Sequence, residues 1–356
     1  MNKLKDWIKH HQVAAFFIIT FTISWGLGFS WSAIIKHEQY LLLPLAFLTA
    51  CGPGLAGIII SALTNTQPKK GPRKTFWIAF LAAWFVSALV CLANLKFYEQ
   101  FSLFPAAVGL FTISVVPVAF VIASAYSRNP AVRSYLSSLV RLRGVWGWSV
   151  AALILIPALF LISVPVSSYL NKQPIPTDQF PELSLSLVGL VVIKFLYQFF
   201  FFNATGEETG WRGFALPRLQ TRTSPLIAAL VITLLWAPWH FFLWQAEGRP
   251  VLSLQFWIEM YIGHFLLSVM IVWMCNRAKG SILVAGIAHA STNTVQAFTP
   301  FGSMLILVLS VAALMMILVD RMWKKLPPDY PALYRQPGMD NLKAGITEEI
   351  LEVSHV

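Results

Sequence analysis

The sequence predicts an all-α membrane protein, a polytopic bundle of about ten transmembrane helices. The 356-residue chain is 57% hydrophobic and only 12% charged, and its mean hydropathy is +0.67. Soluble domains carry about a quarter charged residues, so this composition excludes an ordinary water-soluble enzyme. Two further observations agree: the apolar residues form runs long enough to span a bilayer, and the basic residues form short groups between those runs.

Ten apolar runs are the candidate spans. The first, residues 13–35, follows Lys3, Lys5 and Lys9 and is longer than the apolar part of a secretory signal, so it predicts an anchor helix. Four charge-free runs follow, and then five more apolar runs, some of which contain ionisable residues. These nine runs are residues 40–64, 75–95, 103–127, 145–170, 183–206, 223–246, 252–275, 281–299 and 302–319.

The basic residues predict the orientation of the bundle. Loops on the starting side, with Arg218 and Arg222 among their residues, hold eighteen of the 26 Lys and Arg, against four on the opposite side. Because cytoplasmic loops carry the excess of Lys and Arg, both termini are expected in the cytoplasm. The net charge of +11 is therefore expected to set the orientation of the bundle and to give some attraction to anionic lipid. It is not interpreted as a nucleic-acid site.

Three regions are expected along the chain. Residues 1–130 are N-terminal transmembrane helices of unclear role, residues 131–319 form the functional core, and residues 320–356 form a polar cytoplasmic tail of mixed charge. The three cysteines lie in apolar runs without a CxxC pattern, so neither a disulfide framework nor a thiolate metal site is predicted.

Ionisable residues inside the apolar runs mark the candidate site, because a charge near the bilayer centre costs roughly 3 kcal/mol or more. The strongest group is Glu207-Glu208-x-x-x-Arg212, which follows the apolar run that ends at Phe202. If the helix continues through Leu219, Glu208 and Arg212 pair on one face, whereas Glu207 is rotated by about 100°. One carboxylate is then neutralised locally and the other is available.

Two more polar groups follow in later runs. His240 lies four residues after Trp236, and His289 and Asn293 share one face of the run 281–299. At about 1.5 Å per residue, Glu207, His240 and His289 lie roughly 18, 24 and 14 Å from the cytoplasmic side of a hydrocarbon core about 30 Å thick. Three helices can therefore bring a carboxylate, two imidazoles and an amide to one buried region.

This set of groups suits hydrolysis of an amide bond by an activated water. A carboxylate shielded from water can act as a general base at neutral pH, assisted by an imidazole that holds the same water. His289 and Asn293 can donate hydrogen bonds to an oxyanion that develops on an acyl carbon. No Ser or Cys stands out as a nucleophile beside these groups.

Plainer interpretations stay open for each group. Glu207, Glu208 and Arg212 can form an ion pair that caps a span, and His240 can be a buried imidazole bonded to a carbonyl. His289 and Asn293 can be a polar clasp between helices. Among the other polar residues in the runs, Lys194 and Glu259 are expected to pair, and His264 is expected to pack or hydrogen-bond.

In combination, the Glu207-Glu208-x-x-x-Arg212, Trp236-x-x-x-His240 and His289-x-x-x-Asn293 motifs resemble the CPBP family of intramembrane proteases. That family, also called Abi, includes CAAX prenyl endopeptidases and bacterial proteins of bacteriocin processing and self-immunity. The resemblance covers roughly residues 130–300. Two departures are Trp236, where the CAAX enzymes typically have Phe, and more N-terminal helices than the usual eight or so.

The resemblance implies an intramembrane endopeptidase and a role for each motif residue. Glu207 would be the base that activates water, assisted by His240, while Arg212 orients Glu208. His289 and Asn293 would form the oxyanion site. No cofactor is required on this interpretation. Zinc is the open alternative, with Glu207, His240 and His289 as its ligands, although the His-x-x-x-His spacing of common zinc sites is absent from the sequence.

The expected protein is a multi-pass membrane protein, in the plasma membrane if its source is bacterial. Its partners are the lipid bilayer and a membrane-associated peptide or protein substrate, with no nucleic acid. Two other functions stay open: a non-catalytic bacteriocin-immunity or partner-binding membrane protein, and a proton-coupled transporter in which a buried Glu and two His relay protons.

Overall fold

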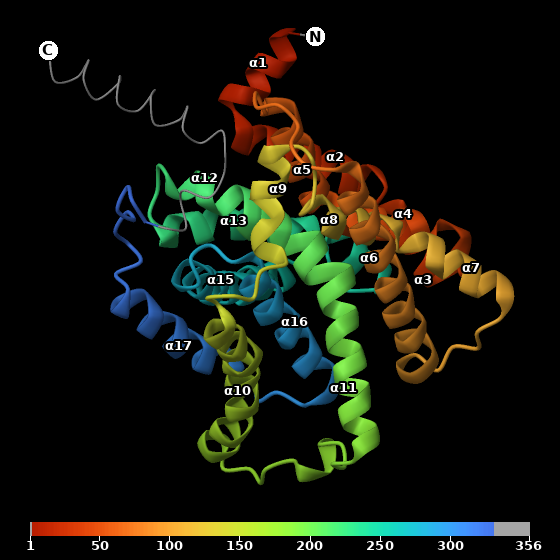
Figure 1. Ribbon diagram of the computed structural model, residues 1–356. Helices are drawn as coiled ribbons and strands as arrows, with labels where there is room; N and C mark the ends of the chain where they lie inside the picture. The colour runs from red at the N-terminus through yellow and green to blue at the C-terminus, as the bar shows by residue number, and fades with distance from the viewer. Residues whose placement is uncertain (1, 331–356) are drawn as a thin grey trace, which may run out of the picture.

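The computed structural model describes residues 2–330, which are all-α, as the sequence predicts (Figure 1). The predicted tail beyond Tyr330 lies outside the described residues. The α-helices are α1 (Asn2–His10), α2 (Gln12–Gly26), α3 (Phe29–His37), α4 (Leu43–Ala50), α5 (Gly52–Thr64), α6 (Arg73–Ala93), α7 (Pro105–Ser114), α8 (Val116–Ser124), α9 (Pro130–Leu136), α10 (Trp146–Asn171), α11 (Leu185–Gln198), α12 (Leu216–Gln220), α13 (Pro225–Trp239), α14 (Phe241–Ala246), α15 (Leu254–Arg277), α16 (Ile282–Phe298) and α17 (Leu305–Val319). Tighter 3₁₀ turns are η1 (Tyr40–Leu42), η3 (Ser137–Leu139) and η4 (Thr177–Gln179), and wider π-helical segments are η2 (Asn94–Tyr98), η5 (Phe199–Glu208) and η6 (Trp211–Ala215).

The number of membrane-spanning helices is lower than the sequence predicts. Within residues 2–330, seven helical segments are long and apolar enough to cross a membrane, or eight if the bent pair Tyr40–Ala50 and Gly52–Thr64 counts as one span. All ten apolar runs are helical, but that pair bends by 55° and α17 has only 15 residues. The 17-residue α16 is mostly buried by its neighbours. Apolar runs in the sequence do not show how long each helix is or where it bends.

The segment Leu185–Gln220 is one continuous helical stretch of 36 residues with two different halves. The first half, α11, has no buried residue, as expected for a surface that faces lipid. The second half, which carries the Glu207-Glu208-x-x-x-Arg212 motif, is buried almost throughout and is largely π-helical. The predicted continuation through Leu219 is therefore confirmed. The π winding was not predicted. Segments of this kind are rare in proteins, and those that occur often lie at functional sites.

Helices from the N-terminal third pack directly against this motif segment. A Cβ atom added to Gly206 would overlap the Ala50 carbonyl, and one added to Gly210 would overlap Pro53. From the other side, a Cβ on Gly54 would overlap the Thr209 hydroxyl. Small residues let membrane helices approach this closely. The N-terminal helices therefore hold the motif segment in place, while the proposed boundary between residues 130 and 131 stays a prediction.

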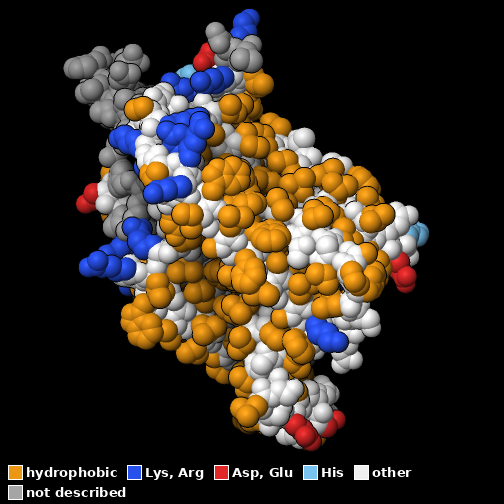
Figure 2. Space-filling view, turned by 45° about the vertical axis from the view of Figure 1, so that its right-hand side comes forward, with side chains coloured by type: hydrophobic (Ala, Val, Ile, Leu, Met, Phe, Trp, Pro, Cys, Tyr) orange, Lys and Arg blue, Asp and Glu red, His pale blue; other side chains and the backbone are white. Residues whose placement is uncertain are grey.

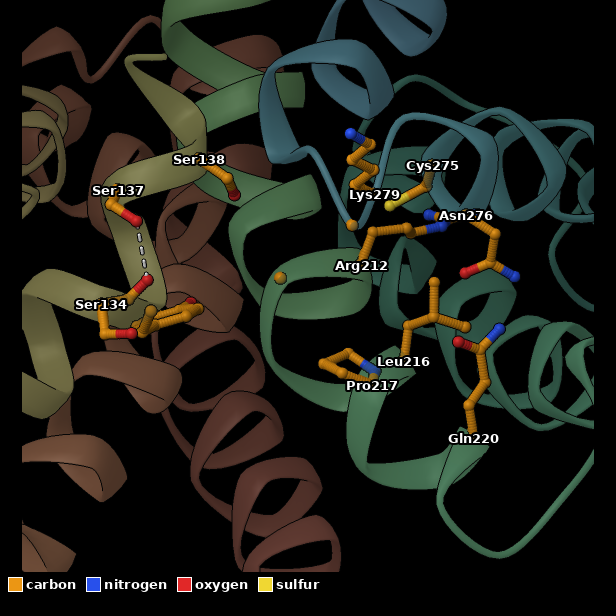
Figure 3. A pocket seen from close by; sticks show the side chains of 13 residues that line it. Ser134, Ser137, Ser138, Arg212, Leu216, Pro217, Gln220, Cys275, Asn276 and Lys279 are labelled. Atoms are coloured by element: carbon orange, nitrogen blue, oxygen red, sulfur yellow. Dashed lines mark hydrogen bonds between the residues drawn. The ribbon is translucent and has the colours of Figure 1, made fainter. Parts of the chain in front are cut away.

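Basic side chains gather at one end of the molecule, beyond a wide belt of hydrophobic side chains (Figure 2). The loop between α10 and α11 lies at the opposite end, at the bottom of Figure 1. Which side of a membrane the basic end faces stays a prediction. Arg218, counted above as a loop charge, is instead 6% exposed and donates a 2.8 Å hydrogen bond to Gln12. A small polar pocket lies near Lys279, at the C-terminal end of α15 (Figure 3).

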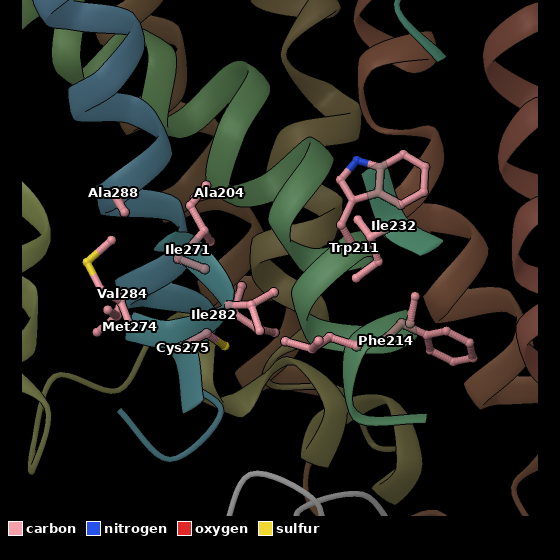
Figure 4. Close-up of a cluster of buried hydrophobic side chains, with 14 of the residues drawn as sticks. Ala204, Trp211, Phe214, Ile232, Ile271, Met274, Cys275, Ile282, Val284 and Ala288 are labelled. Atoms are coloured by element: carbon pink, nitrogen blue, oxygen red, sulfur yellow. The ribbon is translucent and has the colours of Figure 1, made fainter. Parts of the chain in front are cut away.

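The hydrophobic core surrounds the motif segment. Trp211 and Phe214 are fully buried, and Figure 4 shows them among apolar side chains of the neighbouring helices. Phe16 of α2 meets both rings, with centroids 5.6 Å from Trp211 and 5.2 Å from Phe214. Aromatic contacts of this kind stabilise a fixed packing. The N-terminal α2 and the motif segment thus share one core.

One predicted pair of polar residues is wrong. Lys194 does not pair with Glu259: its ammonium lies 3.4 Å from Glu99 and 3.9 Å from the centre of the Tyr98 ring. Glu259 instead accepts a 3.0 Å hydrogen bond from Gln255 on the same helix. Sequence depth alone does not determine which helices are neighbours.

Replacing Gly210 by Ala tests the close contact with Pro53. The added methyl group overlaps Pro53, including its backbone atoms, which cannot shift without a cost in free energy. We therefore expect a loss of about 1–3 kcal/mol of stability and a lower unfolding temperature in detergent. Gly189→Ala on α11 is the matched control, because a Cβ there meets nothing within 4 Å. Equal unfolding temperatures for the two variants would contradict this packing.

Candidate active site

The six motif residues predicted from the sequence lie together in the structure. Glu207 and Glu208 lie at the C-terminal end of η5, His240 directly follows α13, and His289 and Asn293 lie on α16. Arg212 lies on η6 of the same helical stretch as the two carboxylates. The structure therefore places residues of three chain segments together, as predicted. Their catalytic roles stay predictions.

Glu208 is fully buried and is neutralised as predicted. Its Oε1 atom lies 2.9 Å from Arg212 Nη1, and both side chains are 0% exposed. The same oxygen accepts a 2.9 Å hydrogen bond from His289 Nδ1. Arg212 also donates a 3.1 Å hydrogen bond to the hydroxyl of Ser268 on α15. Glu208 therefore joins the motif helix to α16, and Arg212 joins it to α15.

Glu207 points to a different set of partners. Its Oε2 atom accepts a 2.5 Å hydrogen bond from the indole N–H of Trp236, and its Oε1 atom accepts a 3.4 Å bond from the Asn203 amide. The residue is 4% exposed. Both partners are neutral donors, and among the described residues no Arg or Lys pairs with Glu207.

The end of α13 fixes the ring of His240. Pro238 lies in the last turn, and the His240 N–H bonds to the Ala237 carbonyl instead of the Trp236 carbonyl. The Trp236 carbonyl is then available to the His240 ring, whose Nδ1 atom lies 3.0 Å away. Because a carbonyl only accepts, Nδ1 carries the proton. The other nitrogen, Nε2, lies 3.6 Å from Glu207 Oε2.

Asn293 reaches Glu207 through a residue that the sequence analysis missed. The Asn293 amide donates to Asn203 Oδ1 at 3.3 Å, and the Asn203 amide in turn donates to Glu207. Asn203 is 0% exposed and lies one turn before Glu207. A buried amide four residues from a motif carboxylate was the available signal, but Asn203 belongs to none of the three motifs.

Trp236 is the centre of the site and not only an aromatic position of the motif. Besides its bond to Glu207, its ring lies 4.5 Å from the Arg212 guanidinium and 5.1 Å from the His289 ring. His264 of α15 packs edge-on against it at 4.9 Å and lies 5.3 Å from His240. The predicted packing role of His264 is confirmed, and its Nδ1 bonds to the Met260 carbonyl at 2.8 Å.

A tyrosine from the basic end supports the motif segment from outside the spans. Tyr135 of α9 is 2% exposed, and its hydroxyl donates a 2.6 Å hydrogen bond to the Thr209 carbonyl. Burial raises the pKa of Tyr135 well above its usual value. It therefore stays a neutral donor at physiological pH and supports the backbone between η5 and η6.

The zinc alternative does not fit the side chains as they lie. Within residues 2–330, no group of three or more His, Cys, Asp and Glu is arranged to hold a metal ion. His289 directs Nδ1 to Glu208, whereas Glu207 and His240 face each other. As they lie, the three proposed ligands form no such group, and metal dependence stays a matter for experiment.

Comparison with known proteins gives the same family as the motifs. Residues 188–295 match the sequence model of the Rce1-like family, described as type II CAAX prenyl endopeptidase. A protein of Methanococcus maripaludis named CAAX prenyl protease 2 is 26% identical over 239 residues, which cover 64% of this chain and 83% of that protein. The resemblance is thereby confirmed: the chain carries the region of the Rce1-like CAAX prenyl endopeptidase family, a family of CAAX-type intramembrane proteases.

Replacing Trp236 by Phe keeps the ring and removes the indole donor. A hydrogen bond to a charged group contributes about 1.5–3 kcal/mol, so the variant should unfold at a clearly lower temperature. Trp239→Phe is the matched control, because among the described residues the Trp239 indole nitrogen has no hydrogen-bond partner. Its unfolding temperature should be equal or higher, and a larger loss in Trp239→Phe would refute the assignment.

Proposed function

We propose that the chain is an intramembrane endopeptidase that hydrolyses a peptide bond of a membrane-associated peptide or protein. The observation that carries the proposal is the facing pair Glu207 Oε2 and His240 Nε2, 3.6 Å apart. With Nδ1 protonated in the neutral ring, both atoms are acceptors, so a water that donates one O–H to each satisfies both. Such a water keeps a lone pair for attack on a carbonyl carbon.

The reaction proceeds by general base catalysis. Glu207 takes a proton from the water as the water oxygen bonds to the substrate carbonyl carbon, and the carbonyl oxygen becomes an oxyanion. His240 accepts the second O–H and orients the attack. The C–N bond then breaks, and the proton moves from Glu207 to the leaving nitrogen, which gives a carboxylic acid and an amine.

His289 and Asn293 are proposed to stabilise the oxyanion. Glu208 occupies Nδ1 of His289, so Nε2 remains for the substrate and donates when the ring is an imidazolium. The Asn293 amide has two N–H groups, one of which is used by Asn203. The role of Arg212 is indirect: it holds Glu208, and Glu208 in turn holds the His289 ring.

The substrate class follows from the family and the location of the site. The relative from Methanococcus maripaludis is named a prenyl protease, so a peptide with a prenylated cysteine near its C-terminus is the first probe to test. The multiple long apolar helices indicate an integral multi-pass membrane protein, and a plasma membrane location is proposed if the source is bacterial. The immunity and transporter alternatives predict no hydrolysis by purified protein.

Glu207→Gln should lower the turnover of a fluorogenic prenyl peptide by about 10²-fold or more, since a general base contributes 10²–10⁴. The variant should stay folded, because the Gln carbonyl still accepts from Trp236. His240→Ala should show a similar loss. Glu259→Gln is the matched control, an exposed glutamate of a neighbouring helix with Gln255 as its partner. Full activity in Glu207→Gln would refute the proposal and leave the non-catalytic alternative.

Chelation tests the choice between a metal-free site and zinc. We expect purified protein treated with a chelator, and shown by elemental analysis to be free of zinc, to hydrolyse the peptide at its original rate. Calcium serves as the control addition after chelation. A loss of activity that zinc restores and calcium does not would reverse this choice.

A further inference from the structure

A small polar pocket is lined by Arg212, the partner of Glu208. It is lined by α9 and η3, by the motif segment with Arg212 and Gln220, and by the end of α15 with Cys275, Asn276 and Lys279 (Figure 3). The pocket is at the basic end of the molecule. Among the described residues that line it, none is acidic.

Three side chains at this pocket carry buried polar atoms without partners. Within the described chain, both amide atoms of Gln220, Oδ1 of Asn276 and Nε of Arg212 make no hydrogen bond. The three residues are 2%, 7% and 1% exposed, respectively. Buried polar groups are almost always paired, so unpaired atoms from three residues at one pocket indicate a missing partner.

The chemistry of these atoms decides which partner fits. Two of them donate, Arg212 Nε and Gln220 Nε2, and two accept, Gln220 Oε1 and Asn276 Oδ1. An anion would be repelled by the two acceptors, and a cation by Arg212 and Lys279. A water both donates and accepts, so it matches this mixed set. Rotation about the last side-chain bond of Gln220 costs little energy, so either Oε1 or Nε2 of its amide can face the pocket.

The size of the pocket agrees with water. The space open to the centre of a water molecule is about 20 Å³, and one water needs roughly 10–15 Å³ on the same measure. The pocket therefore has room for one ordered water.

We propose that this pocket is a built water site, in which one water bridges the Arg212 guanidinium to the amides of Gln220 and Asn276. The water completes the hydrogen bonds of Arg212, whose other nitrogens hold Glu208 and Ser268. This site does not depend on the proposed peptidase activity.

Radiolytic footprinting of the full-length protein tests this site with the chain's own cysteines. X-rays convert bound water to hydroxyl radicals, which oxidise the nearest side chains. Cys275 lines the pocket, whereas Cys51 and Cys91 do not, and all three are buried free cysteines. We expect Cys275 to be oxidised several-fold faster than the other two, as measured by mass spectrometry. Equal rates for the three cysteines would overturn the proposal.

Two variants and a halide distinguish a bound water from an empty pocket or a bound anion. Asn276→Leu fills the pocket and removes an acceptor, so Cys275 oxidation should fall to the level of Cys51. Ser137→Ala is the matched control at the rim, because that hydroxyl is already bonded to Ser134, and its labelling should equal wild type.

Unchanged labelling in Asn276→Leu, or anomalous bromide density in the pocket of a crystal, would contradict a water site. If Asn276→Leu does not fold, the wild-type comparison of the three cysteines still decides.

Discussion

The structure depends on how two adjacent carboxylates are both buried in an apolar bundle. Burial of an unpaired charge is among the most costly events in folding, so each carboxylate needs its own partners. Glu208 has a full countercharge in Arg212 and a second contact to His289. Among the described residues, Glu207 has the neutral donors Trp236 and Asn203 and faces the His240 ring. In the proposed function, Glu208 is the structural carboxylate and Glu207 the catalytic one. The contacts of the two carboxylates bring α13, α15 and α16 together at the motif segment.

The remaining architecture keeps that meeting point in place. Glycines let the N-terminal α5 lie against the motif segment with almost no gap, and Tyr135 supports the segment from the basic end. The π-helical winding of η5 and η6 widens the backbone through the motif. Helices of the N-terminal third are therefore part of the support of the site, in a chain whose family match covers only residues 188–295.

Much of this was predictable because the sequence is so poor in charge. The few ionisable residues left in apolar runs pointed to the site, and the four-residue spacing of Glu208 and Arg212 gave their pairing. Contacts between different helices were not predictable from spacing: Trp236 as a donor to Glu207, Asn203 as the link to Asn293, and Glu99 as the partner of Lys194. The sequence predicts ten spans, whereas seven or eight helical segments are long and apolar enough, because α16 has 17 residues and α17 has 15.

The central claim is that Glu208 holds the fold while Glu207 performs the chemistry. Its most direct test is the unfolding temperature of Glu208→Gln beside that of Glu207→Gln, in the same detergent. Glu208→Gln leaves the Arg212 charge buried without its partner, so it should lose about 3–5 kcal/mol and unfold many degrees lower. Glu207→Gln should unfold within a few degrees of wild type. Equal unfolding temperatures, or the greater loss in Glu207→Gln, would contradict the account.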